Sequence, residues 1–555
     1  MPRGICRVRR KLASAENGLP GPATLELLMR YPSRHIETLL QGNSCAGERN
    51  LRLYRLFVYH GIEISSDFSG HMCSEDSLLF HVSAFLKHNG FGDLSAESLL
   101  RVARVSDSDR KVRKLLLGRS LLKPMSVFGQ MEGKLKQGII DMLLQERTEA
   151  KTQGSNIEKV YRKQLDWLLR NRSVVFNLFI REQFCYKNNN DIRVLSASQR
   201  RLLVPEAVVE RRPLQVHFAG TPCVAYSPRG RRLGLGDDSS VLLAIYLAER
   251  VAFAEKNLED VCFHENSVTF PAESELHDTL ENAGTHKCIT LRFSCLEEGW
   301  PFCRQRTFTC MYNVKTMIWT GAKCPKQIDK EFNNLFCNRY PVVDGSVFMV
   351  SSPADTELEQ KEQQEQRRKR NIGCVGDVLS WGQAKRKKMF EEVFEDQLQK
   401  SRAVFADINQ LPPRHKLSPN INALTRKAQI YSWKDDRLAT TYETMLCMGL
   451  PGSKSLPPVG DCGLYSPNAS VYEEIGCRGR MQMVGNGQHL SSNGAFMLYC
   501  FANLMMVSDT VAELQHQLKF NNDMDTDFDD DDSDLGELKF CSDTCTDFAW
   551  MTDEH

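Results

Sequence analysis

The feature that most constrains the fold is the segment from about Arg211 to Ser352, where short apolar runs alternate with helix-type patterns. Runs rich in β-branched and aromatic residues predict strands, and longer apolar stretches predict buried helices. Elements that alternate in this way pack as a sheet with helices on it, so we expect an α+β domain over residues 211–352. The expected strands are 214–218, 223–226, 268–270, 288–295, 307–319 and 347–350, and the expected helices are 239–258, 273–281 and 327–336.

The N-terminal part has a different pattern. Residues 1–22 are basic and then rich in Gly and Pro, which predicts a flexible arm. Residues 23–210 are predicted to form a mainly helical domain with one or two strands. A strand is expected over residues 51–64 because aromatic and branched residues cluster there. Helices are expected to start at Ser74, which Glu75 and Asp76 follow, at Ser95, and near Asn156.

The C-terminal third is predicted to be largely disordered. Few large apolar residues occur in 353–420, and 421–490 are rich in Pro, Gly, Ser and Asn without a sustained period. We therefore expect a charged linker with basic clusters over 353–420, a loosely structured region over 421–490, an apolar helix over 491–520 and an acidic disordered tail over 521–555.

The tail carries 13 Asp or Glu residues and one Lys, Lys539. So much like charge prevents burial, because each buried carboxylate costs more free energy than a few aromatic rings return. Aromatic residues among acidic ones are typical of disordered segments that bind partner proteins. The expected partner-binding residues are Phe528, Phe540, Phe548 and Trp550. The alternative is a tail that only improves solubility.

Composition excludes several classes of protein. The chain has 555 residues, 41% hydrophobic and 25% charged, which is ordinary for a globular protein with at least one large core. The longest apolar run, Gly494 to Val507, is shorter than the roughly 20 residues that cross a bilayer, so no membrane span is expected. The 19 cysteines show no repeated short spacing and are expected to be reduced.

Two basic tetrads in the expected linker resemble a bipartite nuclear import signal, which an importin-type receptor would bind. Flexible basic clusters are also often merely solvated. If the signal is used, the protein is nuclear. The residues of the two tetrads are Arg367, Arg368, Lys369 and Arg370, and Lys385, Arg386, Lys387 and Lys388.

A second basic cluster suggests a nucleic-acid contact. Between Arg101 and Arg170 there are 16 Lys or Arg against 8 Asp or Glu, so one helical face is expected to be positive. Such a face can hold phosphates without reading sequence, although a solvated helix exterior is the alternative. The candidate contact residues are Arg110, Lys111, Arg113 and Lys114.

Sequence motifs give little support for an enzyme, a cofactor or a metal. The turn from Gly234 to Ser240 has glycines at a helix start, but it lacks the full spacing of a phosphate-binding loop, and Asp237 and Asp238 would repel phosphate. Seven cysteines and three histidines lie between 262 and 337 without the cysteine pairs that are typical of zinc sites. These residues are Cys262, Cys288, Cys295, Cys303, Cys310, Cys324 and Cys337, with His264, His277 and His286.

Together these observations predict a non-enzymatic nuclear regulator or scaffold that recruits protein partners at chromatin through its acidic tail. No cofactor and no metal is expected. One alternative is a structural subunit of a DNA repair, recombination or cell-cycle complex. A metal-dependent enzyme that handles phosphate, built on residues 234–240, is a further alternative.

Overall fold

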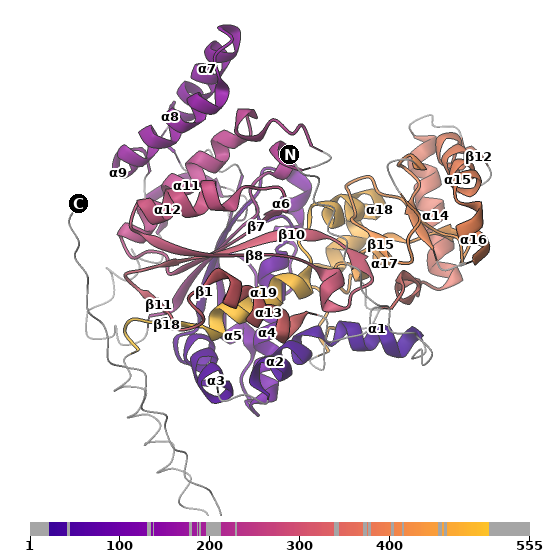
Figure 1. The fold of residues 1–555 in the computed structure, drawn as a ribbon, viewed down its shortest axis with the longest axis horizontal. Coiled ribbons are helices and arrows are strands. Elements are labelled where there is room, and N and C mark those ends of the chain that lie inside the picture. The colour runs from indigo at the N-terminus through magenta and orange to yellow at the C-terminus, as the bar shows by residue number, and fades with distance from the viewer. Residues whose placement is uncertain are drawn as a thin grey trace, which may run out of the picture. The chain divides into compact units, whose positions relative to one another are not determined.

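The computed structural model describes residues 21–41, 45–129, 135–136, 138–176, 180–185, 187, 190–195, 212–227, 230–337, 343–369, 374–375, 379–400, 404–412, 416–452, 458–459 and 463–509 (Figure 1). Contacts divide the chain into two units, Met1–Val507 and Ser508–His555, and the helices and strands reported below belong to the first unit. The acidic tail 521–555, with its four aromatic residues, and the basic arm up to residue 20 lie outside the described residues.

A seven-stranded mixed sheet forms the centre of the first unit, with the strand order β3-β2-β1-β6-β7-β10-β8. The first five strands in this order are parallel, and β10 is antiparallel to its neighbours β7 and β8. The chain builds outward from β1 to β3 and then resumes at β6 on the other side of β1, so the order reverses between β1 and β6. The strands are β1 (Ile62–Asp67), β2 (Leu100–Ser106), β3 (Ser126–Phe128), β6 (Leu214–Ala219), β7 (Val261–Ser267), β8 (His286–Ser294) and β10 (Gln305–Asn313).

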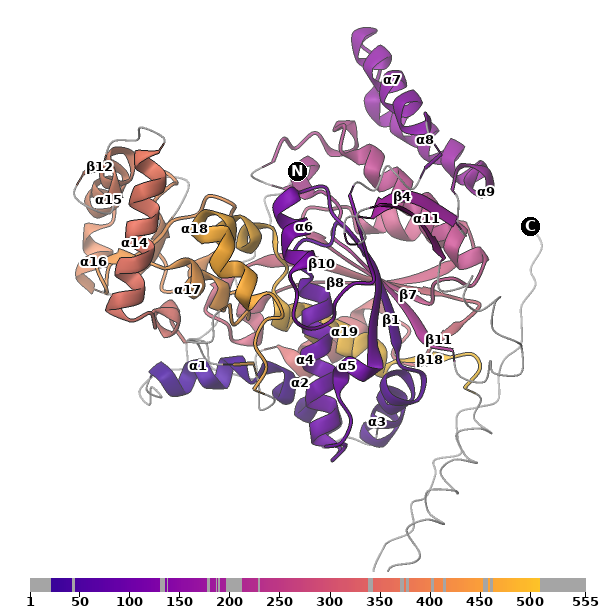
Figure 2. The same ribbon diagram turned by 180° about the vertical axis from the view of Figure 1, so that it is seen from behind.

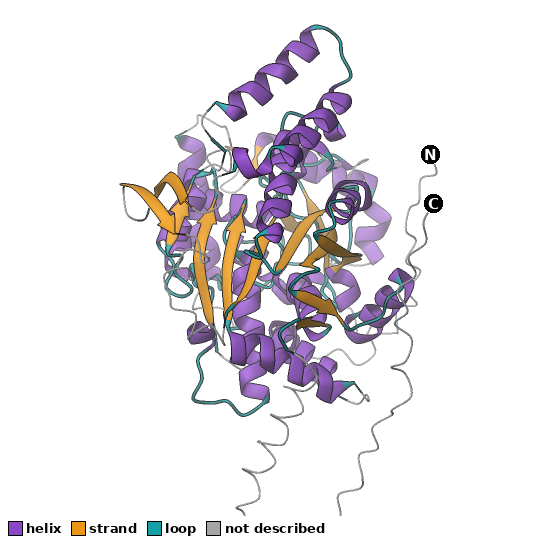
Figure 3. Cartoon of the chain, turned by 90° about the vertical axis from the view of Figure 1, so that its left-hand side faces the viewer, coloured by secondary structure: helices purple, strands orange, loops and turns teal. Residues whose placement is uncertain are grey.

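Helices cover both faces of the sheet (Figures 1 and 2), as the fully buried pattern of β6 requires. The main covering helices are α4 (Cys73–His88), α11 (Ser240–Glu255) and α19 (Leu490–Ala502). On one face α11 belongs to the same apolar cluster as Cys262 and Met311. On the other face α4 and α19 share a cluster with Val216 and Phe263. Figure 3 shows the strands side by side with helices on either side.

The remaining helices are mostly short. They are α1 (Gly21–Met29), α2 (Tyr31–Leu40), α3 (Ala46–Tyr54), α5 (Ala96–Leu99), α6 (Arg110–Leu117), α7 (Ile139–Thr152), α8 (Ile157–Arg170), α9 (Arg172–Val175), α12 (Asp278–Asn282), α13 (Pro325–Phe336), α14 (Pro353–Arg368), α15 (Trp381–Val393), α16 (Glu395–Lys400), α17 (Thr441–Leu446) and α18 (Ala469–Asn486). The described residues also form the π-helical turns η1 (Arg55–His60) and η6 (Glu273–His277), and the 3-10 turns η4 (Cys223–Ala225), η5 (Gly234–Gly236), η7 (Cys295–Glu298) and η8 (Gly345–Phe348).

Strands outside the main sheet form small pairings. The pairs are β4 (Ile180–Cys185) with β5 (Asn190–Leu195), β9 (Phe302–Cys303) with β15 (Ile421–Asn422), β11 (Met317–Trp319) with β18 (Leu504–Met506), and β12 (Cys374–Val375) with β13 (Leu379–Ser380). A three-stranded sheet contains β14 (Phe405–Asp407), β16 (Ile430–Ser432) and β17 (Arg437–Leu438).

The prediction of a mixed sheet with packed helices is confirmed, and most elements expected between 211 and 352 occur. Three of the expected strands are wrong. Residues 223–226 contain the 3-10 turn η4, residues 347–350 lie in and after η8, and 268–270 form a turn after β7. These segments contain apolar residues because they pack against the core, and burial alone does not distinguish a buried turn from a strand.

The sheet also extends into the expected helical domain. Residues 51–60 are helical, and the strand β1 begins only at Ile62. The helix that begins after Ser95 ends at Leu99, and β2 follows directly. Both strands pair in parallel with strands distant in the sequence, and local patterns do not reveal such pairing.

The structure also corrects the prediction of a largely disordered C-terminal third, as far as Met506. Helices α14, α15 and α16 occupy the expected linker, and a small apolar cluster gathers Phe390, Ile408 and Tyr431 from separate short elements. The expected loose region contains α17 and α18, and the final helix α19 is buried along its whole length. In the described part of the chain, no helix is both long and apolar enough to span a bilayer.

Candidate functional site

A cavity of about 440 Å³ lies where the strand order reverses, at the carboxyl ends of the parallel strands. In open α/β sheets this switch point is where ligands bind, because the loops after neighbouring strands diverge there. The lining comes from the ends of β1 and β7, from the segments that follow β1, β2 and β6, from the start of β10, and from the connection between α18 and α19. It includes Asp67, Gly70, Glu75, Asp107, Asp109, Thr221, Cys223, Glu265, Asn266, Arg304, Arg306, Arg426, Gly487 and Gln488.

The side of the cavity at the carboxyl ends of β1 and β2 is acidic. Asp107 follows β2, and its Oδ2 accepts a hydrogen bond from the Gly70 amide at 3.0 Å, which fixes the turn between β1 and α4. Burial raises the pKa of the Asp107 carboxyl. Asp67 ends β1, and its Oδ1 accepts a hydrogen bond from the Ser106 hydroxyl at 2.7 Å. Hydrogen bonds to the Asp67 and Asp107 carboxylates therefore link the end of β1 to the end of β2.

Glu75 adds a further carboxyl in the first turn of α4. It is 1% exposed, and its Oε1 has no hydrogen-bond partner among the described residues. Burial raises its pKa to about 7. Its neighbour Asp76 forms an ion pair with the buried Arg119, which neutralises the charge of Asp76. A helix start that binds phosphate offers amides and positive charge, whereas this one places Glu75 against the cavity.

The side of the cavity at the carboxyl ends of β6 and β7 contains a thiol. Cys223 is exposed and begins the η4 turn four residues after β6 ends. The turn is anchored through Thr221, whose backbone oxygen and hydroxyl both accept hydrogen bonds from the Asn266 side chain at 3.1 Å. His264 Nε2 lies 2.8 Å from the same hydroxyl. Residues of β7 thus hold the loop that presents the thiol.

Charged groups from β7 and β10 lie beside this thiol loop. Glu265 and Arg306 form an ion pair of 2.7 Å between Oε1 and Nε. Arg304 is buried and donates to the backbone oxygen of Leu424 at 3.4 Å. Burial, with the nearby charge of Arg306, lowers the pKa of Arg304 to about 10, so it remains a cation at neutral pH. A carboxylate and two guanidinium groups therefore share the cavity with the thiol.

The segment expected to be loosely structured completes the wall. Arg426 donates from Nε to Asn486 Oδ1 at 2.6 Å. A Cβ atom at position 487 would lie 2.4 Å from His71 Nε2, so only glycine allows this close approach of the chain to the turn after β1. Gln488 accepts a hydrogen bond from Asn493 Nδ2 at 2.9 Å. The cavity is therefore closed by residues more than 350 positions from β1.

The candidate nucleic-acid contacts on α6 are largely engaged within the chain. Lys114 forms an ion pair of 2.9 Å with Glu474. Lys111 donates to Gln482 at 3.0 Å, and Arg113 donates to the backbone oxygens of Asp107 and Ser108 at 3.0 and 2.7 Å. Arg110 is exposed. The helix lies at the edge of the cavity, which its residue Val112 lines, and a contact of its basic residues with nucleic acid stays a prediction.

The two basic tetrads lie mostly on helices. Arg367 and Arg368 end α14, Lys369 pairs with Glu365 at 2.8 Å, and Arg370 lies outside the described residues. The second tetrad lies on α15. Its Lys387 donates to Asp436 at 3.0 Å and its Nζ lies 4.6 Å from the ring centre of Tyr431, while Lys385 and Lys388 are exposed. Import through these residues stays a prediction.

The glycine turn from Gly234 to Ser240 offers no phosphate cradle. The buried Arg147 donates to the backbone oxygens of Leu235 and Asp237 and to the Ser240 hydroxyl, at 3.3, 2.7 and 2.7 Å. Asp237 is itself paired with Arg231 at 2.7 Å. The turn therefore serves to attach helix α7 to the start of α11.

The sequence contained a signal for the cavity that its local patterns did not reveal. Asp67 ends a buried strand, Asp107 comes one residue after the next strand, and Cys223 and Glu265 lie at or near the ends of β6 and β7. Polar residues at the carboxyl ends of parallel strands meet at one edge of a sheet. The signal requires knowing that β1, β2, β6 and β7 are parallel neighbours.

Comparison of the sequence with known protein families and with curated proteins finds no match. Among solved structures, a prophage-encoded E. coli protein described as a DNA modification methyltransferase is 10% identical, with a TM-score of 0.40, over 80% of this chain and 99% of its own. The Dnmt2 methyltransferase of S. pombe is 10% identical, with a TM-score of 0.38, over 79% and 97%. The methyltransferase EhMeth of Entamoeba histolytica is 10% identical, with a TM-score of 0.34, over 80% and 98%.

These findings correct two predictions from the sequence. The solved structures found are described as methyltransferases, a finding that contradicts the predictions of a non-enzymatic scaffold and of a chain that is not an enzyme. The chain's own switch-point cavity is lined by an exposed thiol, a carboxylate and two arginines. The chemistry of these residues determines which ligands the cavity can accept.

Proposed function

We propose that the chain is an enzyme that transfers a methyl group from S-adenosylmethionine to a base of a nucleic acid. The observation that supports this most directly is the composition of the switch-point cavity. Carboxyl groups line the cavity at the carboxyl ends of β1 and β2. A thiol, a carboxylate and arginines line it near the ends of β6 and β7 and the start of β10. The names of the similar structures suggest the reaction class.

The acidic side favours a cationic nucleoside over a phosphorylated one. At this position of a doubly wound sheet, the acid after β2 binds ribose hydroxyls, a role that Asp107 can fill. A dinucleotide also needs a glycine-rich turn and a helix start without competing negative charge, whereas Glu75 lies in the first turn of α4. S-adenosylmethionine has no phosphate and carries an ammonium and a sulfonium group. Charge attraction to Glu75 and Asp67 would therefore orient it.

When bound, S-adenosylmethionine supplies a methyl group on a positively charged sulfur. The role assigned to Cys223 is to add its thiolate to an electron-poor ring carbon of a pyrimidine, which makes the adjacent carbon nucleophilic enough to take the methyl group. Glu265 is positioned by Arg306 to hold a proton at a ring nitrogen during the addition. Loss of the proton from the methylated carbon and elimination of the thiolate then restore the aromatic ring and free Cys223.

The rim of the cavity supports a nucleic acid as the carrier of that base. Arg304, Arg306 and Arg426 line the cavity. Arginines bind phosphates through planar, bidentate hydrogen bonds. Enzymes that modify a base take it out of the stack and into a pocket, which requires such contacts around the opening.

The experiment that tests the proposal measures transfer of a labelled methyl group from S-adenosylmethionine to DNA and to RNA by the full chain. We expect transfer to at least one of them and a loss of about 10³-fold or more in kcat for Cys223→Ser, with donor affinity retained. Cys324→Ser, which changes an exposed cysteine outside the cavity, is the matched control and should keep full activity. No transfer to either polymer, or full activity of Cys223→Ser, would refute the proposal.

The basic tetrads and the acidic tail support a second proposal about location and partners. Two basic clusters 14 residues apart support import into the nucleus, and the aromatic residues of the tail support binding of a partner protein. Replacing Lys385 and Lys388 by alanine changes exposed positions of α15 and tests import with a fluorescent fusion. We expect the double variant to move toward the cytoplasm. An unchanged distribution would exclude these two lysines as import determinants.

A further inference from the structure

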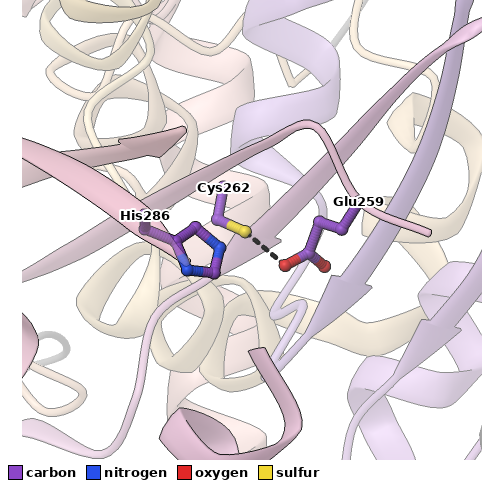
Figure 4. Close-up of side chains that lie close together, drawn as sticks. All are labelled: Glu259, Cys262 and His286. Atoms are coloured by element: carbon purple, nitrogen blue, oxygen red, sulfur yellow. Dashed lines mark hydrogen bonds between the residues drawn. The ribbon is translucent and has the colours of Figure 1, made fainter. Parts of the chain in front are cut away.

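A buried cluster outside the cavity brings together three side chains of the kind that bind metals. Glu259 precedes β7, Cys262 lies in β7, and His286 begins β8, with β10 between the two strands. One ligand atom from each residue lies within 4.8 Å of the other two. The three residues are 3%, 0% and 1% exposed. In Figure 4 the Cys262 sulfur points toward the Glu259 carboxylate, and the His286 ring lies on the other side of the sulfur.

We infer that Glu259, Cys262 and His286 form a buried zinc-binding site. The first support is the hydrogen-bonding of the imidazole. His286 Nδ1 lies 2.9 Å from the Thr285 hydroxyl, whereas Nε2 is buried and has no hydrogen-bond partner among the described residues. Metal-binding histidines typically use one ring nitrogen as the ligand and the other in a hydrogen bond that orients the ring. A zinc ion would satisfy the nitrogen that the protein leaves unpaired.

The second support is the balance of charge. Arg250 forms ion pairs with both Glu249 and Glu259, so one buried cation faces two buried carboxylates. Tyr246 and His217 also face the cluster, and His217 Nε2 lies 3.3 Å from Asp67 Oδ2. With Glu249 neutralising Arg250, a zinc ion would be neutralised by the Glu259 carboxylate and the Cys262 thiolate. The group would then carry no net charge.

The hydrogen bond inside the cluster shows which proton the ion would displace. The Cys262 thiol donates to Glu259 Oε1 at 2.6 Å, whereas cysteine binds zinc as a thiolate. Binding of zinc therefore releases one proton per ion.

The choice of zinc follows from the ligand types. Sulfur and nitrogen ligands exclude magnesium and calcium, which prefer oxygen, and a tetrahedral ion accepts one sulfur, one nitrogen and carboxylate oxygens. Between residues 262 and 337 the sequence offers no pair of cysteines at the spacing of a zinc site. The pair at that spacing is Glu259 and Cys262, which have two residues between them, and the sheet brings His286 to it.

The decisive measurement is the metal content of the full chain, purified without a histidine tag and dialysed against a chelator. We expect about one zinc per chain, with an X-ray absorption shell of one sulfur near ~2.3 Å and lighter atoms near ~2.0 Å. Zinc below about a tenth per chain, or a shell without sulfur, would overturn the inference and leave a hydrogen-bonded network in its place. Because metal content is measured without substrate, this outcome does not depend on methyl transfer.

Variants then assign the ligands. His286→Gln and Cys262→Ser are expected to lower the zinc content at least tenfold, while Cys447→Ser, at another buried cysteine, keeps it. Retention of one zinc by His286→Gln would contradict the assignment. If Cys262→Ser does not fold, the X-ray absorption spectrum of the unchanged protein still shows whether a cysteine binds the zinc, because it reports the sulfur ligand directly.

Discussion

Glu75 is the residue whose chemistry differs most from its ordinary behaviour, because it is a buried carboxyl in a cavity that we assign to a cationic ligand. Burial raises its pKa from 4.5 to about 7, so the folded protein holds this proton more tightly than the unfolded chain. The stability that this proton contributes is complete below pH 4.5 and is lost as the pH rises through 7. Above that pH the folded protein carries a buried negative charge beside the cavity.

Glu75→Gln should therefore raise stability while it weakens the binding of the donor. We expect the free energy of unfolding of the variant to exceed that of the unchanged protein by roughly 3 kcal/mol at pH 8, with the difference falling toward zero near pH 4. Donor affinity at pH 8 should fall about tenfold because the charge partner is gone. Urea unfolding and calorimetric titration measure the two quantities. A variant that binds the donor as tightly as before would show that Glu75 does not face the ligand.

At the scale of elements, the loop that presents Cys223 depends on residues from the neighbouring strand. The side chain of Asn266 donates twice to Thr221, and no other element in the described residues is bonded to that side chain. Asn266→Ala should displace the thiol and lower kcat about 100-fold, while donor affinity stays unchanged. Steady-state kinetics and donor titration separate the two effects. Equal losses in donor affinity and kcat would indicate that the variant disturbs the whole cavity.

Also at the scale of elements, Arg147 attaches helix α7 to the turn that precedes α11. Arg147 is 1% exposed and fills three acceptors at the start of α11. Arg147→Ala should lower the free energy of unfolding by roughly 3 to 5 kcal/mol, because it removes the hydrogen bonds of a buried guanidinium and leaves the Gln164 side-chain oxygen without its donor. Lys151→Ala, on the exposed side of the same helix, should change it by less than about 0.5 kcal/mol in urea unfolding. Similar losses for both variants would contradict the role of Arg147.

Elements of the central region were predictable because their signals are local. The strand at Leu214, the helix over 240–255 and the Asn156 cap of α8 each follow from neighbouring residues, and the Asn156 side chain does accept a hydrogen bond from the Glu158 amide at 2.9 Å. The site was not predictable in the same way. Asp107 and Cys223 line one cavity only because β2 and β6 both pair with β1, and the pairing of β6 with β1 spans more than 100 residues and leaves no local pattern.

At the scale of the whole molecule, the first unit is built around one sheet to which distant segments contribute. Residues near 70, 220, 305 and 487 enclose the same cavity, so the expected separate domains 23–210, 211–352 and 421–490 share one site. A ligand bound there should stabilise the unit as a whole. At a donor concentration of about 100 times Kd, the gain is about 2.7 kcal/mol, which a thermal unfolding scan should register as a higher Tm. A donor that binds without raising Tm would contradict this arrangement.

The central claim is that the switch-point cavity takes a cationic adenosyl ligand without phosphates. Equilibrium titration of the full chain with S-adenosylmethionine, NAD and ATP tests it most directly. The account predicts one S-adenosylmethionine per chain, an affinity roughly 10- to 100-fold weaker for Asp107→Ala, and no binding of the two phosphorylated ligands at the same concentrations. Binding of NAD or ATP as tight as that of S-adenosylmethionine, or an Asp107→Ala variant of unchanged affinity, would contradict it.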